Sequence, residues 1–403
     1  MQLLHVLGAG PWQLPTIQAA VSLGHRVLVT DYYADRPGYG IAQAHEVIDI
    51  TDLPATLAAA RRHGIDGIVC DSTDTGVATA AHVAQAMGLP GIGRTAARAC
   101  TDKSELRRLT VSSGLPAPRF GVVSSQADPL LATWPQAHPV VVKPVDSQSG
   151  KGVTRVAAGG PLREAVLHAL ANSRQARVLV ESALPGTEFI VDAFVSADGL
   201  QVLGIARKQP YDDNPTISSS ILYLSGDAFS SAQAVLQPAL AAVLAALQLH
   251  QGVVHAEFMV HEGQATVLDV AARGGGVMIY THVLPAICGV DVVAAVIGQA
   301  LGENVSAAPT RRLAARIDFL RAPAGRIEGW AGEVAARHEP GIIALHLSAA
   351  PGDEVGPLTR KDDRTGFVIG VGEDEAAALD AVRRARARLG LRMRGDAQAQ
   401  TLG

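Results

Sequence analysis

Short apolar runs alternate with helix-like stretches in the N-terminal quarter of the chain. The runs lie in LLHVLGAG, HRVLVTDYY and IDGIVCDST, and each is followed by a helical pattern. Strands that alternate with helices and are separated by turn glycines predict βαβ units, and hence a parallel sheet. We therefore expect a Rossmann-like lobe over residues 1–98.

The pattern changes near residue 98. TDKSELRRLTVSSG predicts a helix with Asp102 near its start and Gly114 just past its end. The strand-like PVVVKPV, a loop with glycines, a helix over residues 161–173 and the strand-like RVLVESAL follow. Together they predict a small α+β lid over about residues 116–186.

Hairpins dominate the middle of the chain. Apolar alternation flanks the turn at Asp198 and Gly199, and a second hairpin, VVHAEFMVHEGQATVLDVAAR, follows a helix over residues 232–249. Beyond residue 311, further strands and a basic final helix predict a C-terminal α+β domain over residues 311–403. Residues 99–310 are then the core domain.

Composition excludes several classes of protein. The 403 residues are 48% hydrophobic and 18% charged with a net charge of -4, which argues against disorder and against a general nucleic-acid surface. The three cysteines have no CxxC spacing, so we expect neither a disulfide framework nor a zinc cluster. The opening residues lack the pattern of a signal peptide, and no apolar stretch is long enough to cross a membrane. A cytoplasmic protein is expected.

The second hairpin carries two acidic residues. If its turn is centred on Gly263, Glu257 and Asp269 face each other on neighbouring strands. Adjacent carboxylates repel unless a cation lies between them, and such oxygen ligands suit Mg²⁺. The alternative is a solvated strand face, and the pattern leaves both open.

Arg273 comes four residues after Asp269 and is followed by three glycines. A guanidinium beside exposed backbone amides makes a good anion site. The alternative is a surface arginine before a turn.

Residues 141–153, VVKPVDSQSGKGV, place Lys143 in an apolar strand before a loop of small residues. The loop does not match the P-loop pattern, but a glycine-containing flap can still close over phosphates. An ordinary turn with an exposed Lys151 is the alternative. Lys143 needs a partner, because burying an unpaired ammonium is costly.

The segment GAGPWQ resembles half of a dinucleotide fingerprint, with Asp31 about twenty residues on. A lone GxG is a weak signal, so an NAD-dependent oxidoreductase is only a competing hypothesis. We interpret the segment as a tight turn. His255 and Cys288 are expected to be core or supporting residues.

In order and spacing, these segments resemble the ATP-grasp superfamily over nearly the whole chain. Besides the motifs above, the resemblance includes GVVHAEFMV, VLDVAARGGG and the expected helix THVLPAICGVDVVAAVIGQALGE. It is strongest to the carboxylate-amine ligases, among them dipeptide-forming L-amino acid ligases. The resemblance implies an ATP-grasp fold of mixed α/β and α+β class.

The resemblance also implies roles for individual residues. The nucleotide-binding set comprises Lys103 and Lys143 for the phosphates, Ser147, Ser149, Gly150 and Gly152 in the covering loop, Glu181, Ser182 and Leu184 in the adenine hinge, and Glu188 for the ribose. Glu257 and Asp269 match the carboxylates for one or two Mg²⁺ ions. Arg273 matches the arginine that neutralises an acyl phosphate. Possible substrate contacts are Arg207, Lys208, Asp192, Gly275 and His282.

The implied activity is ATP-dependent joining of a small carboxylic acid, such as an amino acid, to an amine through an acyl phosphate, with release of ADP and phosphate. One departure is Ala271, where many members have Asn, which puts a second metal in doubt. A nucleotide-binding homologue without turnover and a purine-pathway-like ligase or carboxylase are the alternatives. A homodimer is common in the family.

Overall fold

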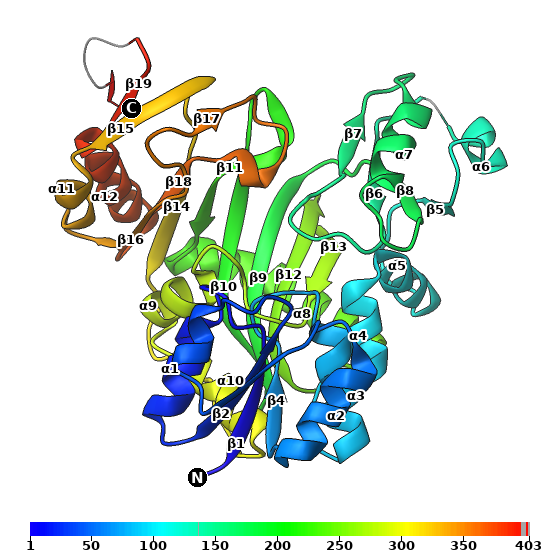
Figure 1. Cartoon of the computed structure of the whole chain (residues 1–403). Coiled ribbons are helices and arrows are strands. Elements are labelled where there is room, and N and C mark those ends of the chain that lie inside the picture. Colours follow the sequence, from blue (N-terminus) through cyan, green and yellow to red (C-terminus); the bar gives the residue numbers. More distant parts are fainter. Residues whose placement is uncertain (136, 396–399, 402–403) are drawn as a thin grey trace.

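A computed structural model describes residues 1–135, 137–395 and 400–401, and arranges them around four sheets. The N-terminal lobe lies at one end of the molecule (Figure 1). The lid, with β6 and α7, and the C-terminal region, with β15 and α12, lie at the other end on opposite sides. A mixed α/β and α+β fold was predicted, and the structure confirms it.

The N-terminal lobe is built on a parallel sheet in the order β3-β2-β1-β4, as predicted. Its strands are β1 (Leu3–Leu7), β2 (Arg26–Asp31), β3 (Ala44–Val47) and β4 (Gly67–Val69). Its helices are α1 (Leu14–Ser22), the short η1 (Pro37–Gly40), α2 (Leu53–His63) and α3 (Val77–Met87). The carboxyl ends of β1 and β4 face the rest of the protein.

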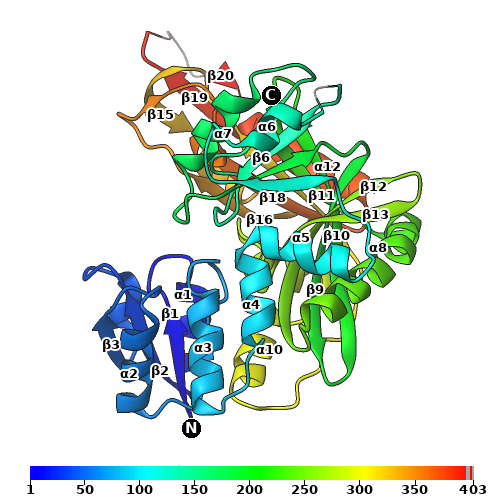
Figure 2. The same ribbon diagram turned by 90° about the vertical axis from the view of Figure 1, so that its right-hand side faces the viewer.

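Two helices, α4 (Arg94–Thr101) and α5 (Lys103–Ser112), connect this lobe to the lid (Figure 2). Asp102 separates them, and its carboxylate accepts from the backbone N–H of Ser104 at 2.9 Å. Such an N-cap satisfies amide groups that the first turn leaves unpaired. Gly114 follows the helix with φ +69°, so both predicted ends of α5 are confirmed.

The lid is an antiparallel sheet in the order β5-β8-β6-β7 with two helices. Its elements are β5 (Phe120–Val123), α6 (Pro129–Thr133), β6 (Val140–Pro144), β7 (Thr154–Val156), α7 (Leu162–Leu170) and β8 (Val178–Ser182). It has its own apolar core, which includes Trp134. The helix α7 ends three residues before the predicted end at Ser173.

The central sheet has eight strands in the order β13-β12-β9-β10-β11-β14-β18-β16. Its strands are β9 (Thr187–Ser196), β10 (Gly199–Tyr211), β11 (Asn214–Tyr223), β12 (Gly252–His261), β13 (Gln264–Ala271), β14 (Ala314–Leu320), β16 (Ile342–Leu347) and β18 (Gly366–Gly372). Both predicted hairpins, β9–β10 and β12–β13, are present. Apolar side chains of this sheet and of the N-terminal lobe form continuous cores, which fixes the two parts against each other.

The C-terminal region adds a smaller sheet in the order β17-β15-β19-β20. Its elements are β15 (Gly325–Ala331), α11 (Glu333–Arg337), β17 (Glu354–Val355), η3 (Lys361–Asp363), α12 (Glu375–Arg388), β19 (Gly390–Met393) and β20 (Gln400–Thr401). The strands β14, β16 and β18, also beyond residue 310, extend the central sheet. The predicted division at residue 310 therefore cuts between paired strands, and the domain limits stay a prediction.

One predicted helix is broken. The segment from Thr281 onward forms the π-helical turn η2 (Ile279–Val283), α9 (Leu284–Cys288) and α10 (Val292–Ala300). Gly289 ends α9 with φ +75°, and the Asp291 carboxylate caps α10, so the chain bends by 113° at this point. The sequence predicted one continuous helix because the apolar periodicity continues across the bend. That prediction was wrong, since Gly289 and the Asp291 cap break the helix.

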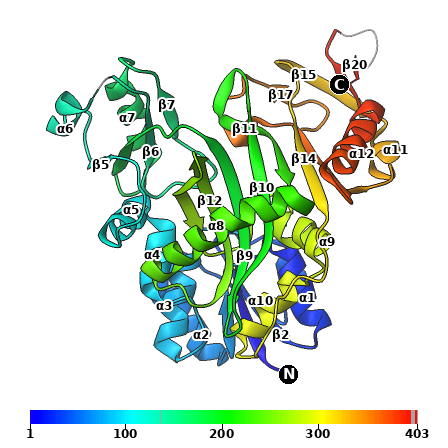
Figure 3. The same cartoon turned by 180° about the vertical axis from the view of Figure 1, so that it is seen from behind.

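The helix α8 (Gly226–Leu247) lies across one face of the central sheet (Figure 3) and begins before the predicted Ala232. By length and composition alone, α8 could cross a membrane. The bent pair of η2–α9 and α10 also qualifies if it is counted as one span, and no other helix within the described residues does. The helix α8, however, packs against the sheet. Its large apolar side chains, among them Phe229, Leu236 and Leu240, are buried in the core. The sequence analysis did not anticipate so long an apolar helix.

Candidate active site

The two carboxylates of the second hairpin lie opposite each other, as predicted. Glu257 on β12 pairs in register with Asp269 on β13. At the tip, however, His261 pairs with Gln264, so the turn is centred before Gly263 and a bulge after Glu257 restores the predicted pairing. The Glu257 and Asp269 side chains are 23% and 35% exposed, which leaves both within reach of a ligand.

Lys103 links this hairpin to the glycine loop, which we define as residues 147–152. Its Nζ lies 3.2 Å from Asp269 Oδ2 and donates to the Ser147 carbonyl oxygen at 2.9 Å. Burial alone would lower the pKa of Lys103, but the Asp269 carboxylate raises it overall. A charged ammonium therefore stands between the loop and the paired carboxylates.

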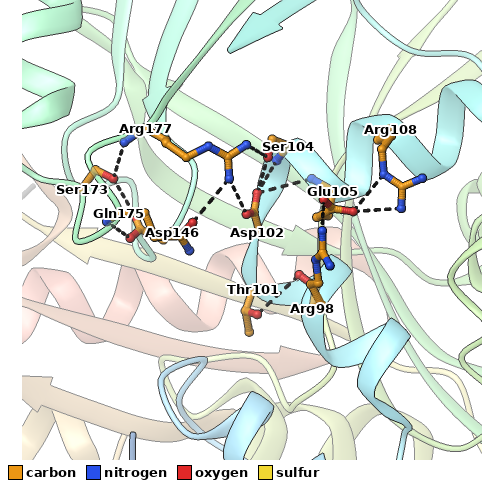
Figure 4. Close-up of polar contacts among 10 residues, drawn as sticks. All are labelled: Arg98, Thr101, Asp102, Ser104, Glu105, Arg108, Asp146, Ser173, Gln175 and Arg177. Carbon is orange, nitrogen blue, oxygen red and sulfur yellow. Dashed lines mark hydrogen bonds and ion pairs between the residues drawn. The ribbon is translucent and has the colours of Figure 1, made fainter. Parts of the chain in front are cut away.

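Polar contacts fix the start of α5 and the base of the glycine loop (Figure 4). Arg177 Nη1 lies 3.2 Å from Asp102 Oδ2, and Arg177 Nη2 donates to Ser104 Oγ at 3.0 Å. Next to them, Asp146 accepts from Ser173 Oγ at 2.8 Å and from the Gln175 backbone N–H at 2.8 Å. Lys103 and the loop are thus held by a common framework.

The glycine loop needs backbone conformations that few side chains adopt. Ser149, Gly150 and Gly152 have φ of +58°, +72° and +74°. A Cβ at Gly152 would also lie 2.7 Å from Asn172 Cβ. Ser147 Oγ donates to the Lys151 carbonyl oxygen at 2.7 Å, which closes the loop on itself. Because the loop contains two glycines and two serines, few of its side chains would hinder a bound phosphate.

Lys143 is buried and its partner is Glu181, with Nζ 2.7 Å from Oε2. The fully buried Arg107 also pairs with Glu181 and donates to the Leu268 carbonyl oxygen at 2.8 Å. Burial alone would raise the pKa of Glu181, but Lys143 and Arg107 lower it to about 2. The Glu181 side chain is therefore engaged, and its backbone pairs with Phe120 and Val141 of the neighbouring strands, so the predicted adenine contact of Glu181 stays a prediction.

The other two predicted hinge residues follow directly. The Ser182 N–H donates to the Arg119 carbonyl oxygen at 2.9 Å at the end of β8, and Leu184 lies half-buried in the loop before β9. Their role in binding adenine stays a prediction.

Lys208 on β10 connects two predicted site residues. Its Nζ pairs with Glu188 and lies 3.0 Å from Glu257 Oε1. Burial alone would raise the pKa of Glu257, but the ammonium groups of Lys208 and Lys361 lower it overall. Successive residues of a strand point to opposite faces, so Arg207 lies on the other face of β10 and is not brought to this cluster.

Arg273 is held by a residue that the sequence analysis missed. Its Nε and Nη2 donate to Asp74 Oδ1 and Oδ2 at 2.7 and 3.0 Å. The Asp74 backbone N–H donates to Gln148 Oε1 of the glycine loop at 3.1 Å. The loop after β4 thereby joins the predicted catalytic arginine to the flap.

The glycines after Arg273 permit close packing. A Cβ at Gly274 would lie 2.3 Å from Tyr280 Cγ, and one at Gly275 would lie 2.9 Å from His255 Nδ1. Gly276, by contrast, has no neighbouring atom within 4 Å of such a Cβ.

Two predicted substrate contacts lie elsewhere or are already engaged. Asp192 is buried, and its carboxylate accepts from Tyr223 Oη at 2.5 Å and contacts His255 Nδ1 at 2.7 Å. Asp192 therefore supports the core under Gly275. His282 is exposed and contacts Thr281 Oγ1 at 2.7 Å, and it is not brought into the cluster.

The glycine turn of the N-terminal lobe is closed by its own side chains. Gln13 Oε1 accepts from Gly10 N–H at 3.1 Å, and Asp31 Oδ2 accepts from Ala9 N–H at 2.9 Å. Asp31 thus serves the turn itself, as expected for a tight turn.

The donor set fits one Mg²⁺ better than two. Glu257 and Asp269 offer hard oxygen ligands side by side, and Ala271 adds none. In the described part of the chain, acidic, histidine and cysteine side chains nowhere gather in threes around a potential metal position. Mg²⁺ commonly takes one or two protein carboxylates and completes its shell with phosphate oxygens and water.

The sequence analysis missed three residues that interact with the predicted site residues: Arg107, Asp74 and Lys361. Asp74 had a usable signal, because ligands of parallel sheets bind beyond the carboxyl ends of the strands and Asp74 follows β4. Arg107 and Lys361 carry no comparable signal, since their positions depend on tertiary packing.

Comparisons with known proteins agree with this architecture. Residues 136–281 match the ATP-grasp domain, and residues 318–394 match the L-amino acid ligase C-terminal domain 2. The chain therefore carries an ATP-grasp domain and, after it, a domain of the L-amino acid ligase C-terminal type, which confirms the predicted resemblance.

The similar proteins comprise curated relatives that match part of the chain and solved structures that superpose over nearly all of it. A formate-dependent phosphoribosylglycinamide formyltransferase from Synechococcus sp. (strain CC9605) is 34% identical over 183 residues, covering 44% of this chain and 46% of the relative. The chain thus spans about half the length of the curated relatives it matches.

Among solved structures, an L-amino acid ligase from Bacillus licheniformis superposes with a TM-score of 0.81 at 20% identity, covering 98% of this chain and 99% of that one. An N5-carboxyaminoimidazole synthetase from Staphylococcus aureus, complexed with ADP, superposes with a TM-score of 0.73 at 15% identity, covering 95% and 96%. At these identities the superpositions establish the ATP-grasp fold.

Proposed function

We propose that this protein is an ATP-dependent carboxylate-amine ligase that joins a small acid, such as an amino acid, to an amine and releases ADP and phosphate. The observation that carries the proposal is the position of Lys103. Its ammonium contacts both the glycine loop at Ser147 and the carboxylate of Asp269. The proximity of the residues expected to bind phosphate, to cover it and to hold the metal supports the proposal.

The reaction follows from these groups. A carboxylate oxygen of the acid attacks the γ-phosphorus of ATP, the bond to the β-phosphate oxygen breaks, and ADP leaves. The amine then attacks the carbonyl carbon of the acyl phosphate, loses a proton, and phosphate departs with the former carboxylate oxygen. The protein mainly aligns the reactants and neutralises charge, with Lys103 and Lys143 near the phosphates and Arg273 near the oxyanion.

Glu257 and Asp269 would hold Mg²⁺ together with phosphate oxygens. The ion would supply neutralisation of the negative charge on the phosphates. In this structure Lys208 pairs with Glu257 and Lys103 pairs with Asp269. Both carboxylates therefore lie where a positive charge neutralises them, which supports a cation at this position.

Exclusion of water is part of the proposal, because an acyl phosphate hydrolyses. The hydrogen bond from Asp74 N–H to Gln148 supports a flap that closes against the N-terminal lobe. Asp74 also orients Arg273, so closing the flap and placing the arginine are linked.

An amino acid substrate is favoured by the C-terminal domain that matches L-amino acid ligases over residues 318–394. A purine-pathway-like reaction is the second candidate, and the 34% identity to a formate-dependent formyltransferase favours it. A homologue that binds nucleotide without turnover is the third, because Ala271 offers no metal ligand.

The test is an assay of ADP and phosphate release with MgATP against pooled amino acids, other small carboxylates and glycinamide-type amines, with mass spectrometry of the products. Glu257→Gln is the inactivating variant. Glu262→Gln is its matched control, because Glu262 lies at the tip of the same hairpin and is 86% exposed. ADP and an amide that appear together and vanish only in Glu257→Gln would support the ligase, whereas nucleotide binding without turnover would favour the third candidate.

Domain limits at residues 98 and 310, a cytoplasmic location and a homodimer complete the proposal. Light scattering of the purified chain would test the dimer, and limited proteolysis would test the domain limits.

A further inference from the structure

A turn of the C-terminal region carries a lysine toward the candidate site. The turn, residues 359–363, is organised by Asp363 Oδ2, which accepts from the backbone N–H groups of Thr359 and Arg360 at 2.8 and 2.9 Å and from Thr359 Oγ1 at 2.8 Å. Asn214 Nδ2, in the β10–β11 hairpin, donates to the Leu358 carbonyl oxygen at 3.2 Å. The turn is therefore a fixed platform beside the central sheet.

Lys361 extends from this platform onto the glycine loop. A Cβ at Gly150 would lie 3.4 Å from Lys361 Cε and 4.0 Å from its Nζ, so the lysine stem rests against the tip of the loop. Its ammonium also lies close enough to Glu257 to lower the pKa of that carboxyl. One side chain thus contacts the flap and faces the predicted metal carboxylate.

The ammonium groups of Lys208 and Lys361 share two neighbouring acidic side chains. Glu188 and Glu257 are the nearby acids, and both already form ion pairs with Lys208. Lys361 has no ion pair within 4.0 Å among the residues that the structure describes. Burial and the Lys208 ammonium lower the pKa of Lys361, while Glu257 and Glu188 raise it less.

A partly buried ammonium that lies beside a second ammonium and forms no ion pair of its own is costly unless a further anion binds it. The glycine loop that it contacts and the metal-type carboxylate whose pKa it lowers are both assigned to the phosphate end of the nucleotide. A lysine that served only to keep the surface soluble would extend into solvent, whereas the Lys361 side chain packs against Gly150.

Resting on the proposed function, we propose that Lys361 binds the transferred phosphoryl group, first as the terminal phosphate of ATP and then in the acyl phosphate. The C-terminal region would in this way contribute directly to a site otherwise built from the core and the lid.

The test compares the binding of the β,γ-imido analogue of ATP with that of ADP, both with Mg²⁺, by titration calorimetry on the full chain. Lys361→Met is the main variant and Lys361→Arg keeps the charge. Arg360→Gln is the matched control, because Arg360 belongs to the same turn and its side chain pairs with Asp363 instead of facing the loop. Thermal unfolding of each variant checks that it is folded.

We expect Lys361→Met to weaken binding of the analogue by about ten- to a hundredfold, the loss typical of a hydrogen bond to a charged group, and to leave ADP binding unchanged. Lys361→Arg should retain most of the affinity, and Arg360→Gln should resemble wild type. Equal weakening of both nucleotides, or of neither, would overturn the inference. A rise confined to the KM of the carboxylate substrate would also overturn it, since the lysine would then bind the acid.

The binding experiment separates this inference from the proposed function. If wild type binds both nucleotides but forms no amide, the ligase proposal fails while the comparison still decides the role of Lys361. If wild type binds neither nucleotide, the proposed function is wrong and the inference falls with it.

Discussion

The buried charges under the lid allow a quantitative prediction about Glu181. Its carboxylate pairs with Lys143 at 2.7 Å and with Arg107, and all three side chains are buried. Glu181→Gln keeps the shape of the side chain but removes the negative charge. Two buried cations then lose their common counterion, which is the situation in which breaking an ion pair is most costly.

The magnitude follows from the pKa of Glu181, which the neighbouring cations lower from the ordinary value of 4.5 to about 2. Each tenfold change in an equilibrium constant corresponds to about 1.4 kcal/mol, so the charged form stabilises the fold by about 3 kcal/mol at neutral pH. Because the pKa is lower in the folded state, this stabilisation is complete above pH 4.5 and disappears as the pH falls through 2. At pH 3 about 1 kcal/mol should remain.

Urea unfolding of wild type and Glu181→Gln, followed by tryptophan fluorescence, measures this difference. Trp134 lies in the lid core and reports on the affected region. The free energy of unfolding should differ by about 3 kcal/mol at pH 7 and by about 1 kcal/mol at pH 3. Glu164→Gln, an exposed position on the lid helix α7, should differ from wild type by less than about 0.5 kcal/mol.

Two results would refute the reasoning. A difference between wild type and Glu181→Gln that stays constant from pH 7 to pH 3 would mean that packing, not charge, stabilises the site. A variant as stable as wild type at pH 7 would mean that Lys143 and Arg107 do not depend on Glu181.

Three further predictions concern the hairpin and the residues around Arg273. Glu257→Gln should lower substrate-dependent ADP formation by at least about a hundredfold, because a charged metal ligand is lost, and a coupled ADP assay would detect any smaller effect. Asp74→Asn should lower kcat about tenfold or more with nucleotide affinity unchanged, since Arg273 loses its bidentate partner; an unchanged kcat would exclude a positioning role. Gly275→Ala should destabilise the protein by about 1–3 kcal/mol in thermal unfolding, because the added Cβ would lie within 3 Å of side-chain atoms. Gly276→Ala, which has open space at the Cβ, should be nearly neutral, and equal effects of the two would contradict the packing argument.

The features that depend on local sequence were predictable. The capping residue Asp102 and Gly114 set both ends of α5, and alternation around a turn identified the β12–β13 hairpin. The pairing of Glu257 with Asp269 was also predicted, although it depends on a bulge that compensates for the shifted turn.

The contacts that depend on tertiary packing were not predictable. Arg107 lies in a charged helical segment that resembles a surface, and it is buried only because β8 of the lid brings Glu181 onto it. Lys361 is separated from Gly150 by more than half of the chain, and no periodicity relates the two positions. The break after Cys288 was missed because the residues on both sides of it are apolar.

The most direct test of the central claim follows one oxygen atom. The acid found in the pooled assay is labelled with ¹⁸O in its carboxylate, and the released phosphate is analysed by mass spectrometry. An acyl-phosphate route predicts one ¹⁸O atom in the phosphate for every amide formed, because the carbon–oxygen bond breaks when the amine attacks. Unlabelled phosphate accompanying amide formation, or formation of AMP and pyrophosphate, would contradict the account.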